Sequence, residues 1–426
     1  MTLHQAIASP GCGCDRQDML HALVSIDEAL ARIAAHASPV GRTEAVQVGS
    51  ALGRTLALPV RSRSMSPAFD NAAMDGYVIK TSALTGPGPW VLPVVARIPA
   101  GQETTTSVAG AVAARIFTGA PISGGADAVV MQEDVLRDGD FIHLSRRPQP
   151  GLNIRRAGSD LARGVNVLDT GQRLGPKEIA VCAAAGAGIV RVRRRLRVAL
   201  LVTGDEVRRA GGAREAAQIW DVNTPMLEAS LARAGIEIVA SAHGADNLSG
   251  LVHQLGQMAA QADLVITTGG ISVGEEDHVK PAVMALGGET LFSGVAIKPG
   301  KPVTLGRIGK AHWLGLPGNP VSAFVTFQVF GTALIRSLTG EATGAPTRRH
   351  VVTATEIRRK PGRCELRPAT LAGFDPHGRE IAHFEDATHS ARVGLLPLAD
   401  GLMFLPADAD NLSAGALVEF QPFCQS

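Results

Sequence analysis

Residues 196–338 alternate between short apolar runs and amphipathic segments, and this alternation constrains the fold more than any other feature. LRVALLVTG, IEIVASAHG and ADLVITTGG are runs typical of buried strands. TPMLEASLARAG and LSGLVHQLGQMAAQ have helical spacing, and NPVSAFVTFQVFGTALIRSL predicts a strong helix further on. Strands joined by helices favour a parallel, doubly wound sheet with right-handed crossovers. We therefore predict a central, mostly parallel α/β domain over 191–340, with ligands bound at the carboxyl ends of its strands.

The rest of the chain divides into segments with either helical or β-type sequence patterns. SIDEALARIAAHA has helical spacing, with Ser25 and Glu28 placed as a capping box. Residues 43–60 suggest another helix, and GPKEIAVCAAAG is helical again. Short β-type runs separated by Pro and Gly occupy two regions, the one between these helical segments and the last part of the chain. The predicted division is a split helical domain at 16–61 and 159–190, an inserted β-rich domain at 62–158, and a C-terminal β domain at 341–426.

Composition limits the partners. The chain has 426 residues, 45% hydrophobic and 19% charged, which suits a soluble multidomain protein. The net charge is only +2 and aromatic residues make up 4%, so we expect no nucleic-acid partner. Five widely scattered cysteines disfavour a disulfide framework and favour the cytoplasm. We see no basic leader with an apolar core and no run of about 18 apolar residues, so we expect no membrane partner.

Acidic turns follow two of the predicted strands. TGDEV places Asp205 and Glu206 after the first strand, and TTGGISVGEED places Asp277 after the third. Each turn alone also fits an ordinary strand-to-helix loop, where acids favour the helix N-terminus. Carboxylates gathered at one sheet edge repel one another unless a hard cation lies between them. Mg²⁺ is the usual choice when phosphate oxygens complete the coordination.

Basic and glycine-rich turns follow in the same domain. KPGKP places Lys298 and Lys301 across a Pro-Gly turn, and LPGNP leads from a strand into a helix N-terminus. Exposed N–H groups at a helix start and two lysines suit an anion such as phosphate, although a plain strand-to-helix connection explains LPGNP equally well. The chain has no GxxxxGK[ST] and no GxGxxG after a strand. The convergence of these turns favours a phosphorylated ligand with a divalent metal.

Two loops of the inserted β-rich segment are also rich in polar residues. FDNAAMDGY carries Asp70, Asn71 and Asp75, and FTGAP carries Thr118 at a strand end. An Asx turn is the purely structural explanation of the first loop. If these loops reached the sheet edge from a neighbouring domain or a second subunit, the site would lie at an interface.

Six motifs, in order, resemble one family. FDNAAMDGY, FTGAP, TGDEV, TTGGISVGEED, KPGKP and LPGNPVSAFVTF match the molybdopterin molybdenumtransferases, which comprise MoeA-type proteins and the E domain of gephyrin. The resemblance runs from about residue 20 to the C-terminus. It implies a central domain similar to the molybdopterin-adenylylating enzymes, the split helical and inserted β domains, a C-terminal β domain, and an elongated homodimer.

The resemblance also implies the activity. Members of the family insert molybdate into adenylylated molybdopterin with Mg²⁺ and release AMP, a transferase step of molybdenum cofactor biosynthesis. The implied catalytic residues are Asp75, Thr118, Glu206, Asp246 and Asp277, and Glu206, Asp246 and Asp277 of these would bind the metal. The implied substrate-binding residues are Asp160, Ser272, Lys298, Lys301, Pro317, Gly318, Asn319, Pro320, Arg367 and Ser390. The adenylylating enzyme and downstream molybdoenzymes are the implied candidate protein partners.

The chain departs from the family pattern at a few positions. Ala72 stands where the family commonly has serine, and Gly294 stands where some members carry a basic residue. HSARV around Ser390 is a weak version of the family's glycine-serine turn. The alternatives are molybdopterin adenylylation, a non-catalytic scaffold of the same fold, and a sugar-phosphate binder that needs no cation. The additional domains and the FDNAAMDG loop favour insertion, and the intact acidic and lysine positions favour an enzyme over a scaffold.

Overall fold

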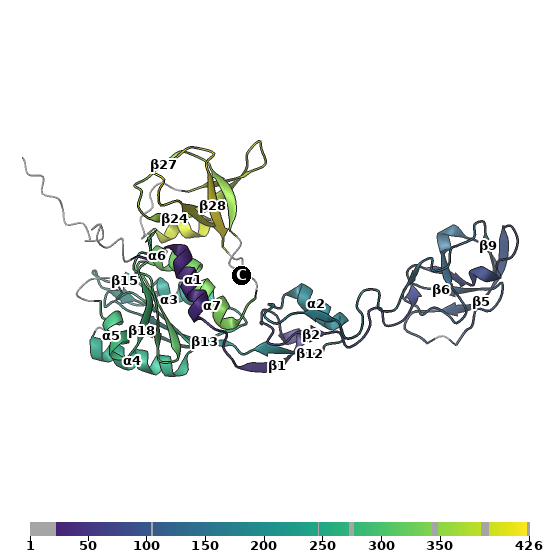
Figure 1. Cartoon of the computed structure of the whole chain (residues 1–426), viewed down its shortest axis with the longest axis horizontal. Coiled ribbons are helices and arrows are strands. Elements are labelled where there is room, and N and C mark those ends of the chain that lie inside the picture. Colours follow the sequence, from purple (N-terminus) through teal and green to yellow (C-terminus); the bar gives the residue numbers. More distant parts are fainter. Residues whose placement is uncertain are drawn as a thin grey trace, which may run out of the picture.

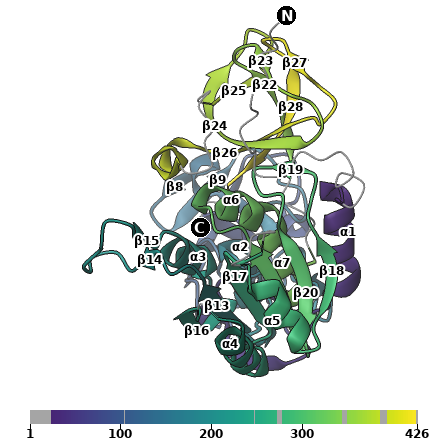
Figure 2. The ribbon, with the colours of Figure 1, turned by 90° about the vertical axis from the view of Figure 1, so that its left-hand side faces the viewer.

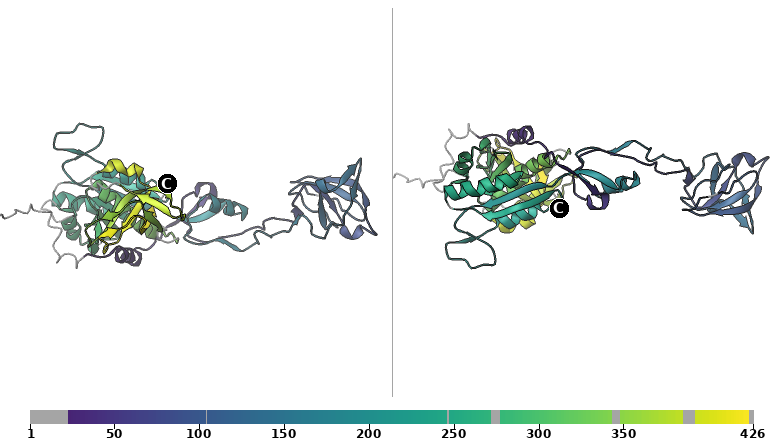
Figure 3. Two further views of the ribbon diagram at one scale, coloured as in Figure 1. Left: turned by 90° about the horizontal axis from the view of Figure 1, so that it is seen from above. Right: turned by 90° about the horizontal axis from the view of Figure 1, so that it is seen from below.

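The protein is elongated, with an α/β body and a C-terminal β body at one end and a separate β body at the other (Figure 1). Two further views show the same narrow stalk between the two ends (Figure 3). The computed structural model describes residues 23–103, 105–245, 247–271, 277–342, 348–384 and 392–423. The domain boundaries predicted from the sequence stay a prediction.

A six-stranded sheet forms the α/β body. In spatial order its strands are β16 (Ile236–His243), β13 (Leu196–Val202), β17 (Leu264–Thr268), β21 (Ala311–Leu316), β20 (Thr304–Ile308) and β18 (Glu289–Ser293). The first four run parallel, β20 runs antiparallel to its neighbours β21 and β18, and β18 therefore has the direction of the first four. This confirms the predicted mostly parallel α/β fold.

Side chains of the sheet alternate between two cores, because successive residues of a strand point to opposite faces. In β13, Val198 and Leu200 face the core that contains α1 (Ile26–His36) and α3 (Asn223–Leu231). Ala199 and Leu201 face the core under α4 (Leu248–Gln261) and α5 (Val279–Ala285). A strand buried on both faces reads as a continuous apolar run, as LRVALLV does.

The strong predicted helix is confirmed over Pro320–Thr339 as α6 (Pro320–Thr326), η5 (Phe327–Gly331) and α7 (Thr332–Thr339). The middle turn, η5, is π-helical. Among the described residues this is the one helix long and apolar enough to cross a membrane. It is 72% buried inside the protein and belongs to the core shared with α1.

The predicted helix boundaries are partly right. Ser25 accepts a hydrogen bond from the Glu28 N–H at 3.1 Å, so the N-cap of α1 is confirmed. The helix α2 (Pro176–Ala184) is also confirmed. For α3 the sequence favoured Thr224 as the N-cap, but the side chain of Asp221 accepts from the Thr224 N–H instead, at 3.0 Å.

The stalk consists mostly of paired strands, so the helix expected within 43–60 is wrong. Its pairs are β1 (Thr43–Gln47) with β12 (Ile189–Arg193) and β2 (Val60–Arg61) with β11 (Asn166–Leu168), whereas the pair of β3 (Asn71–Ala72) with β10 (Ile154–Arg155) packs in the core of the inserted β body. A short 3₁₀ turn, η2 (Val48–Ser50), follows β1. Alternating exposure along TEAVQ fits a strand, and the antiparallel partner β12 is far away in sequence. Long-range pairing decides the conformation of this segment.

The inserted segment is β-rich, as predicted. Its sheet contains β7 (Ala128–Met131), β4 (Gly76–Ile79), β6 (Ala113–Ile116), β5 (Trp90–Ile98), β9 (Phe141–Leu144) and β8 (Leu136–Asp138), with the 3₁₀ turns η3 (Thr81–Ala83) and η4 (Gln132–Asp134). The C-terminal β body is also confirmed. Its strands are β24 (Cys364–Phe374), β25 (Glu380–His383), β22 (Arg349–Thr353), β28 (Leu417–Pro422), β26 (Gly401–Leu405), β23 (Ile357–Arg358) and β27 (Asn411–Leu412), with the 3₁₀ segment η6 (Val393–Leu398).

Candidate functional site

A cavity of about 350 Å³ opens where the parallel strands of the α/β body end. Val202 closes β13, Gly269 follows β17, and Gly318 follows β21, and all three line the cavity. An arm formed by β14 (Val207–Arg208) and β15 (Ile219–Trp220) provides another wall and projects from the body (Figure 2). The cavity therefore lies at the sheet edge that the sequence predicted.

Glycines let the turns approach each other closely at this edge. Gly269 and Gly270 have φ angles of +84° and +63°. A Cβ atom on Gly269 would lie 2.7 Å from Thr203 Oγ1 and 2.9 Å from the Thr203 carbonyl oxygen. A Cβ on Gly318 would lie 3.3 Å from Gly269 Cα. Any side chain at Gly269 would be strained and crowded, so the TTGG turn depends on glycine.

Two of the predicted metal-binding carboxylates, Glu206 and Asp277, line the cavity together. Asp205 and Asp221 join them, so four acids come from two connections of the sheet, one after β13 and one after β17. Burial lowers the pKa of Lys280 on α5, and the charge of Asp277 opposes this shift. Within the described residues no three His, Cys, Asp or Glu side chains cluster closely enough to hold a metal. Two carboxylates still suit Mg²⁺, which takes its remaining ligands from phosphate and water.

The LPGNP turn reaches the same cavity. Gly318 and Pro320 line it, and Pro320 is the first residue of α6. Asn223 Nδ2 donates a hydrogen bond to the Gly318 carbonyl at 2.8 Å, which ties this turn to the start of α3. Pro317 and Asn319, also predicted as substrate-binding residues, flank Gly318 in the sequence but do not line the cavity.

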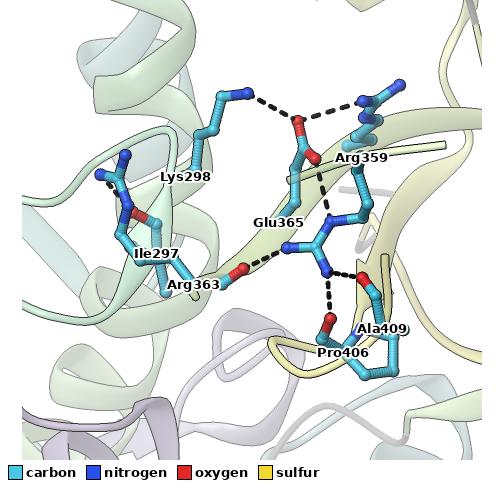
Figure 4. A network of polar contacts seen from close by, with 8 residues as sticks. Ile297, Lys298, Arg359, Arg363, Glu365, Pro406 and Ala409 are labelled. Carbon is cyan, nitrogen blue, oxygen red and sulfur yellow. Dashed lines mark hydrogen bonds and ion pairs between the residues drawn. The ribbon is translucent and has the colours of Figure 1, made fainter. Parts of the chain in front are cut away.

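Lys298 lies outside the cavity lining and joins a charged network with the C-terminal β body (Figure 4). Its strand β19 (Ile297–Lys298) pairs with β24, so that Lys298 lies opposite Glu365. Glu365 is 3% exposed and also contacts Arg359 at 3.3 Å and Arg367 at 3.1 Å. Burial alone would raise the pKa of Glu365, but the charges of Arg367 and Lys298 outweigh it and lower the pKa. Lys301 is likewise not part of the cavity lining.

The predicted residues of the inserted and stalk segments are far from the cavity within one chain (Figure 1). Asp75 Oδ1 accepts hydrogen bonds from the Thr118 N–H at 2.8 Å and the Thr118 hydroxyl at 2.7 Å. These two bonds, with the charge of Arg115, lower the pKa of Asp75. Asp160 accepts from the Ser66 hydroxyl at 3.2 Å in the stalk.

Three of the predicted site residues, Asp246, Ser272 and Ser390, lie outside the described residues. Conversely, several cavity residues carried no motif signal that we used: Trp220, Asp221, Asn223 and His278. Trp220 to Asn223 lie directly before the predicted helix that begins near residue 224. Residues directly before a helix of a doubly wound sheet often line its ligand site, and this position was the available signal for them.

Comparisons with known proteins agree with this architecture. Residues 24–186 match the model of the MoeA N-terminal region (domain I and II), residues 199–337 match the "Probable molybdopterin binding domain", and residues 350–423 match the MoeA C-terminal region (domain IV). The fold and site thus define a multidomain protein with a central α/β domain of the molybdopterin-binding class.

Individual relatives extend over nearly the whole chain. Molybdopterin molybdenumtransferase 2 of Mycobacterium tuberculosis is 34% identical over 91% of this chain and 97% of its own length. The Haemophilus influenzae molybdopterin molybdenumtransferase is 33% identical over 94% and 99%. The crystal structure of the molybdopterin biosynthesis MoeA protein from Pyrococcus horikoshii OT3 has a TM-score of 0.80 at 26% identity, covering 94% of this chain and 100% of that one. The chain belongs to the molybdopterin molybdenumtransferase family, a family of transferases in molybdenum cofactor biosynthesis.

Proposed function

We propose that this protein inserts molybdate into adenylylated molybdopterin in an Mg²⁺-dependent step that releases AMP. The observation that carries the proposal is the cavity at the strand ends, where Glu206 and Asp277 meet the glycine turns and Gly318. Cleavage of a phosphoanhydride asks a protein mainly for positioning and charge neutralisation, which such a cavity supplies.

Each predicted residue has a role in this proposal. Glu206, Asp246 and Asp277 hold and orient Mg²⁺, which neutralises charge at the pyrophosphate when bound. Gly318 and Pro320 bring backbone to the anion, together with Pro317 and Asn319. Lys298, Lys301 and Arg367 bind anionic substrate groups from the side of the C-terminal β body, and Asp160, Ser272 and Ser390 complete substrate binding.

We further propose that the working unit is a homodimer. Asp75 directly precedes β4 and Thr118 follows β6 in the inserted β body, which lies at the opposite end of the molecule from the α/β body (Figure 1), so they can reach a cavity only in a second subunit. In that arrangement the Asp75–Thr118 loop faces molybdate. We place the protein in the cytoplasm, with the adenylylating enzyme and downstream molybdoenzymes as candidate partners.

Reconstitution tests the reaction directly. Purified protein is incubated with adenylylated molybdopterin, molybdate and Mg²⁺, and AMP and the molybdenum cofactor are quantified. We expect AMP release that needs molybdate and stops on chelation. Consumption of ATP by unmodified molybdopterin would support adenylylation instead. Absence of any turnover with cofactor-free, folded protein would support a scaffold.

A further inference from the structure

One wall of the cavity is aromatic. Trp220 is the only Phe, Tyr or Trp among the described residues that line it, and 40% of the residue is exposed. Val207 and Ile219 lie beside it in the same wall. The cavity thus has an acidic and glycine-rich side and an apolar side with one large flat ring.

The backbone on both sides of Trp220 is held in place. The Ile219 N–H donates to the Glu206 carbonyl at 2.7 Å, and the Asp221 N–H donates to the Arg208 carbonyl at 2.7 Å. The Arg214 guanidinium lies over the indole, 5.4 Å from the ring centroid. The indole therefore stands on a fixed strand, and the Arg214 cation lies over one of its faces.

Three residues further on, Asn223 lines the same cavity and carries a buried acceptor without a partner in the described part of the chain. Its side chain is 6% exposed, and its Nδ2 donates to the Gly318 carbonyl at 2.8 Å. Its Oδ1 is buried and has no hydrogen-bond partner within the described part of the chain. A buried acceptor without a partner is costly, so a ligand N–H that reaches it would be favoured.

We propose that Trp220 and Asn223 form a subsite for a planar heteroaromatic ring with an N–H donor. The ring stacks on the exposed face of the Trp220 indole, and its N–H donates to Asn223 Oδ1. Stacking on an aromatic side chain accepts any such ring, and the amide oxygen selects rings that carry a donor at the edge. The inference rests on the proposed function in one respect: it makes the ring the pterin or the adenine of the substrate.

Calorimetric titration of the full-length protein with three probes tests this. AMP represents the adenine ring, 6-hydroxymethylpterin represents the pterin ring, and ribose 5-phosphate has no ring system. For the ring that occupies the subsite, Trp220→Ala should weaken binding by about 5- to 150-fold, the range for base–aromatic stacking. Ribose 5-phosphate should bind Trp220→Ala as it binds the unaltered protein.

Two conservative variants separate stacking from a general loss of structure. Trp220→Phe should keep the affinity within about threefold, because phenylalanine still stacks, but it should abolish quenching of tryptophan emission by the ring probe. Trp90→Phe is the matched control, since Trp90 lies in β5 of the inserted body; both affinity and quenching should persist. Asn223→Ala should weaken the ring probe about tenfold, as expected for one lost hydrogen bond.

The outcomes are distinguishable from those of the proposed function. Ring probes that bind Trp220→Ala as tightly as the unaltered protein would overturn the inference, and so would the absence of binding by both ring probes. Ring binding through Trp220 without AMP release in the reconstitution would leave the subsite standing and overturn the proposed reaction. AMP release with an unchanged KM in Trp220→Ala would support the proposed reaction and overturn the Trp220 subsite.

Discussion

Lys298 and Glu365 lie opposite each other across the parallel pair β19–β24, with Lys298 Nζ 3.3 Å from Glu365 Oε1. Lys298 belongs to the segment of the chain that forms the α/β body, and Glu365 belongs to the C-terminal β body. Arg359 and Arg367 contact the same carboxylate, and all of these groups except the lysine are buried (Figure 4). One carboxylate therefore compensates two buried guanidinium groups at the joint between the two bodies.

Removing the charge of Glu365 should destabilise this joint. Glu365→Gln leaves the buried Arg359 and Arg367 without a counter-charge, and breaking a buried pair in this way costs about 3 kcal/mol. The free energy of unfolding from a denaturant titration measures it. The control is Glu356→Gln, which removes an exposed pair with Arg358 and should leave the free energy of unfolding close to that of the unaltered protein. Equal stabilities of the two variants would contradict a stabilising role for Glu365.

The cavity carboxylates should be needed for the reaction and not for the fold. Asp277→Ala and Glu206→Ala should each reduce AMP release by at least about 100-fold, because charge neutralisation dominates phosphoryl chemistry. Circular dichroism and the midpoint of thermal unfolding should stay close to those of the unaltered protein. Glu237→Ala, an exposed acid on β16 outside the cavity, should retain full activity. Full activity in both cavity variants would contradict the assignment.

A shared site predicts that two inactive variants restore each other. Asp75→Ala and Asp277→Ala homodimers should both be inactive in the AMP-release assay. A purified heterodimer of the two contains one intact site and one doubly altered site, so it should regain about half of the unaltered activity, as two-fold symmetry requires. A completely inactive heterodimer, with dimerisation verified by light scattering, would show that Asp75 does not complete the partner's cavity.

The buried His312 should make the fold acid-sensitive. Burial, with the charges of Arg307 and His36, lowers the pKa of His312 to about 4. The unfolded chain binds this proton near pH 6.5, so the neutral histidine's contribution is complete above that pH and is lost as the pH falls toward 4.

The acid sensitivity is measurable by comparing pH 7 with pH 5. For a pKa shift of this size, the loss in free energy of unfolding between these pH values is roughly 2 kcal/mol. His312→Gln should reduce the loss by that amount, whereas His377→Gln, at an exposed position, should not change it. Identical pH dependence in the His312→Gln variant and the unaltered protein would rule out this source of acid sensitivity.

Local sequence patterns predicted the elements whose conformation depends on their own periodicity. The runs LRVALLV and ADLVI became β13 and β17, and Ser25 capped α1 as its spacing with Glu28 indicates. Residues 43–47 were misread as helix, because their strand conformation comes from pairing with 189–193, almost 150 residues away. A local sequence pattern does not reveal a partner strand that lies so far away in the sequence.

By itself, the sequence determined the family, the mostly parallel sheet, and the turns TGDEV, TTGG and LPGNP at one edge of it, because parallel strands must bring their carboxyl ends together. The tertiary structure decided which of these residues meet. It placed Glu206, Asp277 and Gly318 in one cavity with Trp220 and Asn223, and it directed Lys298 to Glu365. It also joined Asp75 to Thr118 in the inserted β body, which lies at the far end of the stalk (Figure 1). Distances between side chains from separate bodies depend on long-range packing, which motif spacing does not encode.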